Sequence, residues 1–400
     1  MTAWSEYSTG ERVKILRGTE MTQAALAEAA GVSVALVQKV EQGGSVKVAS
    51  LIKLADALGT DVGVLLGQQA PRRAMRRAER TALRAISLAV HDSALVSHAP
   101  DAEPGTLADL QKANAAVWAA YWSGDYPNLG ALVPALITEA RAFTDAHDGR
   151  LAEQGSAILA EGYEVAACVA NILGKRDLAY AAVAHAMRAA DSSGDELLSA
   201  NLAALLAWVY LRDGRTERAV KVAEDAAVSI APSFADASPA RLSVFGNLML
   251  RAAVSASRRD DRIRATDFLS QAHAAAARVG KDGNLYQTAF GPTSASTQAV
   301  GIHLAFGNIG QALDLIENTR LPADMPKAAK SRYMLDVALA WCEARQWDKA
   351  ADTLLDVCSE APEWVRHQEL AGQVAQRLGD GSTAKLRKIT QLLGVPLLPR

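Results

Sequence analysis

A short turn followed five residues later by an alanine recurs through the chain, about every 38 to 47 residues. The five pairs are Gly174 and Ala179, Gly214 and Ala219, Asp260 and Ala265, Gly307 and Ala312, and Arg345 and Ala350. This interval suits two antiparallel helices per unit, and each unit can bury its apolar face only against its neighbour. The pattern therefore predicts an α-solenoid over residues 106–400.

The composition also favours an all-α chain. Half of the 400 residues are apolar but only 5% are aromatic, which suits close-packed helices better than sheets. The longest apolar run, Leu202 to Leu211, covers about half of a membrane span. The N-terminus lacks a signal-peptide pattern, and the three cysteines show no CxxC spacing. We therefore expect a cytoplasmic protein that does not associate with membranes.

The stretch from Thr22 to Gly43 has the pattern of two short helices joined by a tight turn. Thr22 and Ser33 can cap the two helices, and Gly31 supplies the permissive backbone of the turn. If Val37 and Val40 point inward, the opposite face of the second helix carries only small and polar residues. Such a face can enter the major groove of DNA and donate hydrogen bonds there. Its residues are Val34, Ala35, Gln38, Lys39 and Gln42.

Residues 11–67 resemble the phage-repressor-like, or Xre, helix-turn-helix family. The matching positions are Thr22 and Gln23 at the start of the second helix, Gly31-Val32-Ser33 at the turn, and Glu41 and Gly43 at the end of the third helix. The resemblance implies a domain of five short helices in residues 1–70 that binds double-stranded DNA. The chain departs from the family at Gly44-Ser45-Val46-Lys47, where proline and then serine or threonine often precede the fourth helix.

The expected DNA contacts follow from the chemistry of each side chain. Gln38 can pair with adenine, and Val34 and Ala35 can touch thymine methyl groups. Lys39 and Gln23 are expected to contact phosphate, with Ser45 or Lys47 in place of the family's usual phosphate contact. The full set of expected DNA-binding residues is Thr22, Gln23, Ser33, Val34, Ala35, Gln38, Lys39, Gln42, Ser45 and Lys47.

An arginine-rich segment follows the predicted DNA-binding domain. The first 70 residues carry six basic and seven acidic side chains, whereas residues 71–84 add six arginines and one glutamate. These arginines are Arg72, Arg73, Arg76, Arg77, Arg80 and Arg84. If the segment is helical, most of them share one face that could track phosphates; the alternative is a solvated linker helix. Two prolines and a glycine in residues 91–105 mark a domain boundary, so residues 71–105 are interpreted as a linker.

The second region loosely resembles tetratricopeptide repeats, although its interval exceeds their 34 residues. The whole chain resembles actinobacterial regulators that join an Xre-type helix-turn-helix to a tetratricopeptide-like region. The segments that carry this resemblance are residues 174–190, 290–293, 307–315 and 361–370. Under the leading hypothesis the repeat region dimerises and senses an effector.

Polar residues amid the apolar runs of the repeat region indicate a candidate site for a peptide or small-molecule effector. Amide side chains can pair with a peptide backbone, and an arginine can hold a carboxylate. Alternatively, the asparagines satisfy helix ends. Pro292 interrupts or begins a helix, which either presents backbone groups to a ligand or only shapes the solenoid. The candidate residues are Asn171, Asn201, Trp208, Asn247, Arg251, Phe290, Thr293, Gln298 and His303.

No motif indicates catalysis. The seven histidines are scattered without an HExxH pattern, and no phosphate-binding GxxxxGK loop is present. Cys342 and Cys358 fall on the two helices of one predicted pair and are expected to be buried packing residues. We expect no catalytic residues, no metal and no cofactor. The leading hypothesis is a homodimeric transcriptional regulator; the alternative is a protein-interaction scaffold with weak or non-specific DNA binding.

Overall fold

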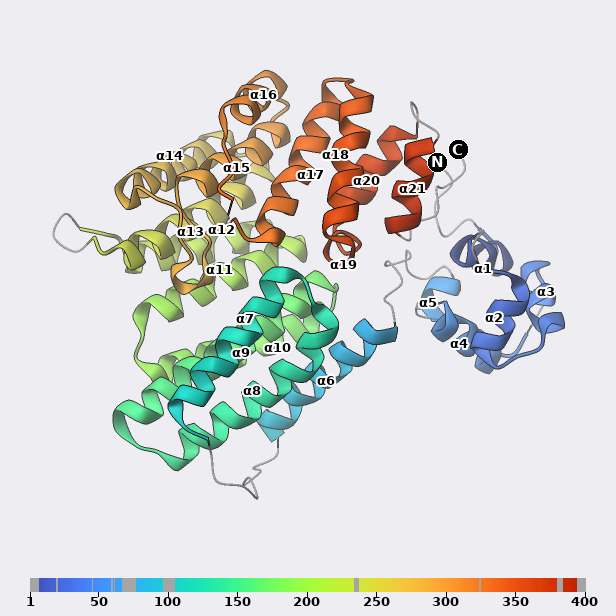
Figure 1. Cartoon of the computed structure of the whole chain (residues 1–400), viewed down its shortest axis with the longest axis horizontal. Coiled ribbons are helices and arrows are strands. Elements are labelled where there is room, and N and C mark those ends of the chain that lie inside the picture. The colour runs from blue at the N-terminus through green and yellow to red at the C-terminus, as the bar shows by residue number, and fades with distance from the viewer. Residues whose placement is uncertain are drawn as a thin grey trace.

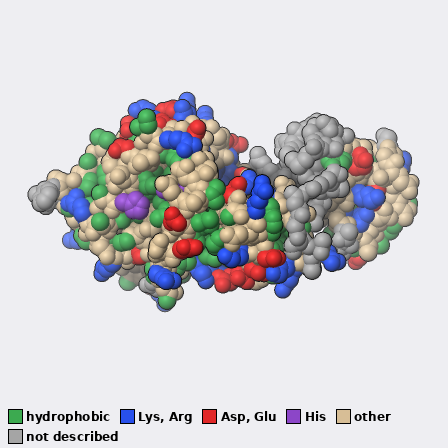
Figure 2. Space-filling model, turned by 90° about the horizontal axis from the view of Figure 1, so that it is seen from above, with side chains coloured by type: hydrophobic (Ala, Val, Ile, Leu, Met, Phe, Trp, Pro, Cys, Tyr) green, Lys and Arg blue, Asp and Glu red, His purple; other side chains and the backbone are tan. Residues whose placement is uncertain are grey.

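The computed structural model describes residues 7–18, 21–44, 46–58, 60, 62–66, 77–95, 105–233, 237–323, 325–379 and 384–393, and within them it contains helices and no strands. A small helical domain lies beside a larger array of helices (Figures 1 and 2). None of the described helices is both long and apolar enough to cross a membrane. The expected fold class, a helix-turn-helix domain followed by a helical solenoid, is confirmed.

The N-terminal domain consists of five short helices around one apolar core. Their bounds are α1 (Thr9–Arg17), α2 (Gln23–Ala30), α3 (Val34–Glu41), α4 (Val48–Ala57) and α5 (Val62–Leu65). The core side chains Val13, Leu26, Val37, Leu54 and Leu65 are all fully buried. The domain has the five helices expected from the sequence. Gly59 and Asp61, where the sequence predicts the end of the fourth helix and the cap of the fifth, lie outside the described residues.

The larger array is built mainly of antiparallel helix pairs. Its elements are α6 (Arg77–Leu95), α7 (Leu107–Ser123), α8 (Tyr126–Ala146), α9 (Gly149–Ile172), α10 (Arg176–Ser193), α11 (Glu196–Arg212), α12 (Thr216–Ser229), α13 (Pro239–Ser257), α14 (Arg262–Val279), the 3-10 helix η2 (Leu285–Gln287), α15 (Pro292–Ala305), α16 (Ile309–Asn318), α17 (Lys327–Glu343), α18 (Trp347–Glu360), α19 (Pro362–Val365), α20 (Glu369–Leu378) and α21 (Ala384–Leu393). Each of five helix pairs contains one of the predicted turns. The pairs are α9 and α10, α11 and α12, α13 and α14, α15 and α16, and α17 and α18.

The predicted turns share one backbone geometry. All five turn residues have positive φ, between 55° at Asp260 and 78° at Gly174. After each turn, a backbone N–H donates to the carbonyl five residues earlier, as in Lys175 N to Ala170 O at 2.8 Å, and this bond satisfies a carbonyl at the helix end. The alanines five residues after the turns are fully buried. The recurring pattern therefore marks the helix pairs correctly.

Arg345 occupies the left-handed turn position where three of the other four repeats have glycine. Its φ of 58° is costly for a residue with a Cβ. Replacing Arg345 with glycine should raise the free energy of unfolding by about 0.5–1 kcal/mol, after the entropy that glycine loses on folding. Denaturant melts measure this change. The matched Gly214→Ala variant, at φ 76°, should be less stable than the parent protein; equal shifts in both variants would refute the explanation.

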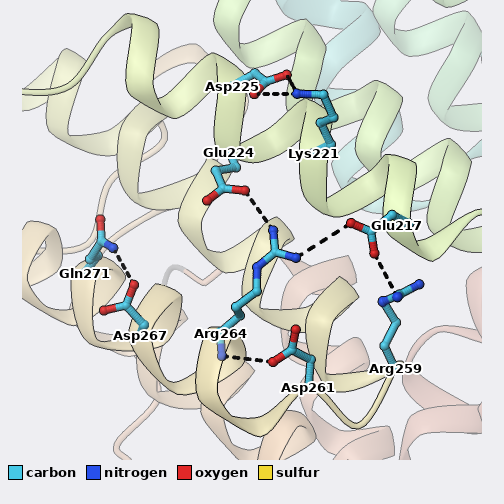
Figure 3. A network of polar contacts seen from close by, with 9 residues as sticks. All are labelled: Glu217, Lys221, Glu224, Asp225, Arg259, Asp261, Arg264, Asp267 and Gln271. Carbon is cyan, nitrogen blue, oxygen red and sulfur yellow. Dashed lines mark hydrogen bonds and ion pairs between the residues drawn. The ribbon is translucent and has the colours of Figure 1, made fainter.

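Ion pairs connect successive second helices on the outside of the array (Figure 3). Arg264 of α14 lies 2.8 Å from Glu224 and 3.7 Å from Glu217, both on α12. Arg259 lies 2.8 Å from the same Glu217. Each pair is partly exposed and contributes at most about 1 kcal/mol. Their shared partners fix how α14 lies along α12.

The predicted 71–105 linker needs correction because residues 77–95 form α6, which packs across α8. Leu83, Ile86 and Val90 of α6 are buried in the core of the array. The two helices are so close that a Cβ added at Gly130 of α8 would lie 2.4 Å from the Cα of Ala82. The linker was predicted from the arginines on the polar side of this segment. Its apolar side packs in the core, so α6 is the first helix of the array.

The two ends of the array meet. His367 Nε2, between α19 and α20, lies 2.9 Å from Glu79 Oε1 of α6, and both side chains are buried. The imidazole also makes an edge contact with Tyr126, with ring centroids 6.0 Å apart. One apolar core contains residues of α6 to α11 together with residues of α17 to α21, including the buried Cys342 and Cys358. A second core joins α11 to α15.

Candidate functional site

The helix-turn-helix is fixed by local hydrogen bonds. Thr22 Oγ1 accepts from Ala25 N at 3.1 Å, and Ser33 Oγ accepts from Leu36 N at 3.2 Å. Gly31 ends α2 with φ 61°, a conformation that glycine adopts without steric cost. Both expected caps and the expected turn are therefore present, and α3 spans Val34–Glu41 directly after the Ser33 cap.

One face of α3 is open to solvent. Val34 is 40% exposed, and the other four predicted groove-facing residues, Ala35, Gln38, Lys39 and Gln42, are also exposed. Val37 and Val40 point the other way, into the core. The structure thus brings the five predicted base-reading and phosphate-facing residues of this helix onto a single accessible surface.

A shallow groove of about 580 Å³ lies between α3 and the start of α4. Its walls are Ser33, Ala35, Leu36, Lys39, Val46, Lys47 and Ser50. Lys39 and Lys47 therefore border one concavity, as expected for residues that meet the same phosphate strand. Ser45 lies outside the described residues. Sequence reasoning missed Ser50, whose position one helical turn after Lys47 was the available signal.

A charged network behind this face joins three helices. Arg17 of α1 donates to both carboxylate oxygens of Glu41 of α3, from Nε at 2.6 Å and from Nη2 at 3.1 Å. Gln23 Nε2 of α2 donates to the same carboxylate at 2.7 Å. Burial alone would raise the pKa of Glu41, but the hydrogen bonds from Arg17 and Gln23 outweigh it and lower the pKa. Glu41 thus ties the end of α3 to α1 and α2.

The Glu41 network predicts a pH dependence of the domain's stability. The folded-state pKa of Glu41 lies below its ordinary value of 4.5, so its contribution is present above that pH and is lost as the pH falls through the folded-state pKa. Glu41→Gln should lower the free energy of unfolding by about 1–2 kcal/mol at neutral pH, with a smaller loss in acid. Thermal melts from neutral to acidic pH test this prediction. Equal destabilisation at every pH would contradict it.

Only part of the arginine-rich segment is described. Arg80 Nη1 donates to the backbone oxygen of Asp56 at 2.8 Å and so connects α6 to the end of α4. Arg84 is exposed. Arg72, Arg73 and Arg76 lie outside the described residues, as does the side chain of Arg77. Arg80 therefore makes a contact between the array and the N-terminal domain, a role that neither sequence interpretation included.

Comparison with known proteins agrees with this geometry. A family model described as helix-turn-helix matches residues 17–65, which contain α2, α3 and the groove beside them. No curated protein matches the chain. The matched region has the Xre-like form of the motif and supports a DNA-binding regulator.

Four of the predicted effector residues form one group inside the array. Asn247 Nδ2 of α13 lies 3.4 Å from Asn201 Oδ1 of α11. Further along the same two helices, the Arg251 guanidinium lies over the Trp208 ring, 5.6 Å from its centroid. Asn201 also donates to the backbone oxygen of Tyr286 at 3.1 Å. The first helices of adjacent pairs do present polar groups to one interior face.

The other five predicted effector residues have local partners or lie apart. Asn171 is fully buried, and Arg176 donates to both its side-chain and its backbone oxygen across the turn that follows α9. Phe290 is buried because Gly246 leaves room for its ring. Thr293 donates to Asp282 at 2.6 Å. Gln298 and His303 follow on α15, which begins at Pro292, and burial lowers the pKa of His303.

Other segments of the chain cover the interior face. Helix α7 packs against α9 and α17, while η2 packs against α11 and α13. Trp122 Nε1 of α7 donates to Gln287 Oε1 of η2 at 2.9 Å and joins the two covering segments. Two glutamates that the sequence did not single out, Glu161 and Glu164 of α9, lie beneath this cover.

Proposed function

We propose that the chain is a homodimeric transcriptional regulator whose helix α3 reads a DNA operator while the helical array dimerises and senses an effector. The observation that carries the proposal is the exposed face of α3, backed by a buried core, within a segment that matches the helix-turn-helix family. One such domain buries little DNA surface, so two copies on a palindromic site are needed for tight and selective binding.

Each side chain of the interface has a distinct proposed role. Gln38 pairs with adenine, and Val34 and Ala35 pack against thymine methyl groups. Lys39 and Lys47 contact phosphate from the two sides of the groove. Gln23 uses one amide hydrogen for Glu41 and keeps the other for a phosphate oxygen.

Replacing Gln38 with alanine should remove sequence discrimination at one base-pair position of each half-site. A bidentate pair contributes about 1–3 kcal/mol of discrimination, so the preference for the correct base should fall about tenfold or more. A binding-selection assay with randomised DNA finds the operator and then measures this loss. Gln271→Ala, on the outer face of α14 (Figure 3), is the control. An unchanged base preference in the Gln38 variant would remove this residue from the proposed reader.

The same assay separates a regulator from a scaffold. A regulator binds its selected sequence more tightly than random DNA at every salt concentration, whereas a scaffold with a non-specific domain shows only the salt-sensitive background. Measurement across a range of ionic strengths therefore tests the proposed function without any knowledge of the effector.

Regulation requires a ligand that binds one arrangement of the array better than another. Helix α6 is the proposed route between ligand and DNA, because Arg80 contacts the N-terminal domain and the preceding Glu79 contacts the far end of the array. Movement of α6 would therefore change the position of the two N-terminal domains of a dimer relative to each other.

A further inference from the structure

Two acidic side chains lie side by side inside the array, on α9. Glu161 Oε2 accepts hydrogen bonds from Trp118 Nε1 at 2.7 Å and from Asn114 Nδ2 at 3.0 Å, both on α7. Glu164 Oε1 accepts from Asn201 Nδ2 at 3.0 Å. Glu164 is only 5% exposed, and its second oxygen, Oε2, is buried without a hydrogen-bond partner among the described residues. The interior therefore contains an unsatisfied acceptor on a buried acid.

The one buried cation described near these acids is Arg251 of α13, which lies over Trp208 and interacts with Tyr121 and Cys168 rather than with the two glutamates. No described lysine or arginine forms an ion pair with Glu161 or Glu164. Burial raises the pKa of both carboxyl groups, and the charge of Glu161 raises that of Glu164 further. A buried carboxylate is unfavourable until a cation or hydrogen-bond donor reaches it. The site is therefore suited to a positively charged guest.

Aromatic rings of α7 stand beside the acids. Trp118 and Trp122 are stacked with centroids 6.4 Å apart, and Tyr121 makes edge contacts with them at 5.6 and 5.2 Å. Aromatic faces attract cations and also pack against apolar groups. This wall thus selects for a guest that is both cationic and apolar.

The segment that covers the site is strained. Tyr286, Gln287 and Ala289 have φ values of 51°, 55° and 47°, and each such residue costs about 1–3 kcal/mol. The segment is held down by Tyr286 Oη donating to Asp195 at 2.9 Å and by the Trp122 contact to Gln287. The partly buried Tyr286 ring therefore packs against the core at an energetic cost, and that cost is released when the segment leaves the site.

A surface groove of about 520 Å³ adjoins this cover. Its walls include the acidic residues Asp191, Asp195 and Glu196, of which Glu196 is paired with Arg241. The remaining negative charge attracts cations to the groove. Asp195 belongs both to the groove and to the hydrogen bond with Tyr286. A cation that competes for Asp195 therefore weakens the bond that holds the cover.

We propose that the effector site binds an organic cation with an aromatic or apolar body, whose charge lies between Glu161 and Glu164 and whose body replaces Tyr286 against Trp118 and Trp122. The inference rests on the proposed function, because it assigns a chemical class to the effector of the regulator. It differs from a peptide site in that recognition comes from buried acids and aromatic faces rather than from backbone pairing.

The test is a titration of the full-length protein, without DNA, followed by tryptophan fluorescence. The probes are benzyltrimethylammonium and 2-phenylethylammonium, and the matched anion is 3-phenylpropionate. Both cations should give a saturable change at millimolar concentration or below, and the anion should not. Glu164→Gln keeps the size and the acceptor for Asn201 but removes the charge, and should weaken cation binding about tenfold or more. Glu217→Gln, on the outer face (Figure 3), should leave binding unchanged.

A second variant tests whether the segment around Tyr286 competes with the cation for the site. Tyr286→Phe removes the hydrogen bond to Asp195 but retains the ring, and should tighten cation binding several-fold. Absence of saturation by either cation, equal binding of the anion, or wild-type affinity in a folded Glu164→Gln protein would each overturn the proposal. If that variant does not fold, the difference between cations and anion in the parent protein decides alone. Operator selection without ligand tests the proposed regulator separately, so the two failures are distinguishable.

Discussion

Replacement of Gly130 by valine is expected to separate α6 from α8 and to lower the free energy of unfolding by about 3 kcal/mol. The reason is steric: even a Cβ at this position would lie 2.4 Å from both Cα and Cβ of Ala82, so one helix must shift as a whole. Denaturant melts measure the stability, and hydrogen exchange of the α6 amides locates the damage.

The matched control is Gly310→Val, because Gly310 lies in α16 with no neighbouring atom within 4 Å of an added Cβ. This variant carries the same β-branched side chain in a helix, but the side chain meets no neighbour. Its free energy of unfolding should therefore stay close to that of the parent protein. Similar losses in both variants would show that the contact between α6 and α8 is not the cause, since valine has a higher helix propensity than glycine.

Replacement of His367 by leucine is expected to cost about 3–5 kcal/mol, the usual loss when one partner of a buried polar pair is removed. The imidazole lies 2.9 Å from the buried Glu79 carboxylate, and leucine fills its space without offering a donor. Thermal or denaturant unfolding measures the effect. The α6 amides should again lose protection from hydrogen exchange, since Glu79 belongs to that helix.

A double variant tests whether this pair acts as a unit. Replacing both Glu79 and His367 with leucine removes the buried charge together with its partner, so much of the lost stability should return. If the two substitutions instead add their separate losses, the contact between Glu79 and His367 is not what joins the two ends of the array.

The helix-turn-helix could be predicted from the sequence because its determinants are local. Thr22, Gly31 and Ser33 act within three or four residues of their own positions, and the buried and exposed faces of α3 follow from helical periodicity. The network of Arg17, Gln23 and Glu41 was missed because it joins three helices. Its geometry depends on how those helices pack, which periodicity does not specify.

The repeat turns were also predictable, including two without glycine. Asp260 and Arg345 were recognised from their distance to a buried alanine, and both adopt the left-handed conformation. These turns could be recognised because the buried alanine of the next helix always lies five residues after the turn residue. The likeness to tetratricopeptide repeats stays a prediction.

The arrangement of the chain's ends could not be predicted. Glu79 and His367 are separated by 288 residues, and no local pattern connects them. The segment around Glu79 was interpreted from its arginines, although Leu83, Ile86 and Val90 place it in the array. In the same way, Asn201 was recognised as an interior polar residue, but its acidic partner Glu164 comes from a different helix pair.

Helices from both ends of the array contribute to one core, and this limits how such a protein can change in length. An open stack of repeats can gain or lose a unit, because each unit touches only its neighbours. Here an extra helix pair between α12 and α16 would carry His367 away from Glu79 and break the seam between first and last helices. We therefore expect the number of pairs to be fixed, and length variation among natural or designed versions to fall in the connections between helices.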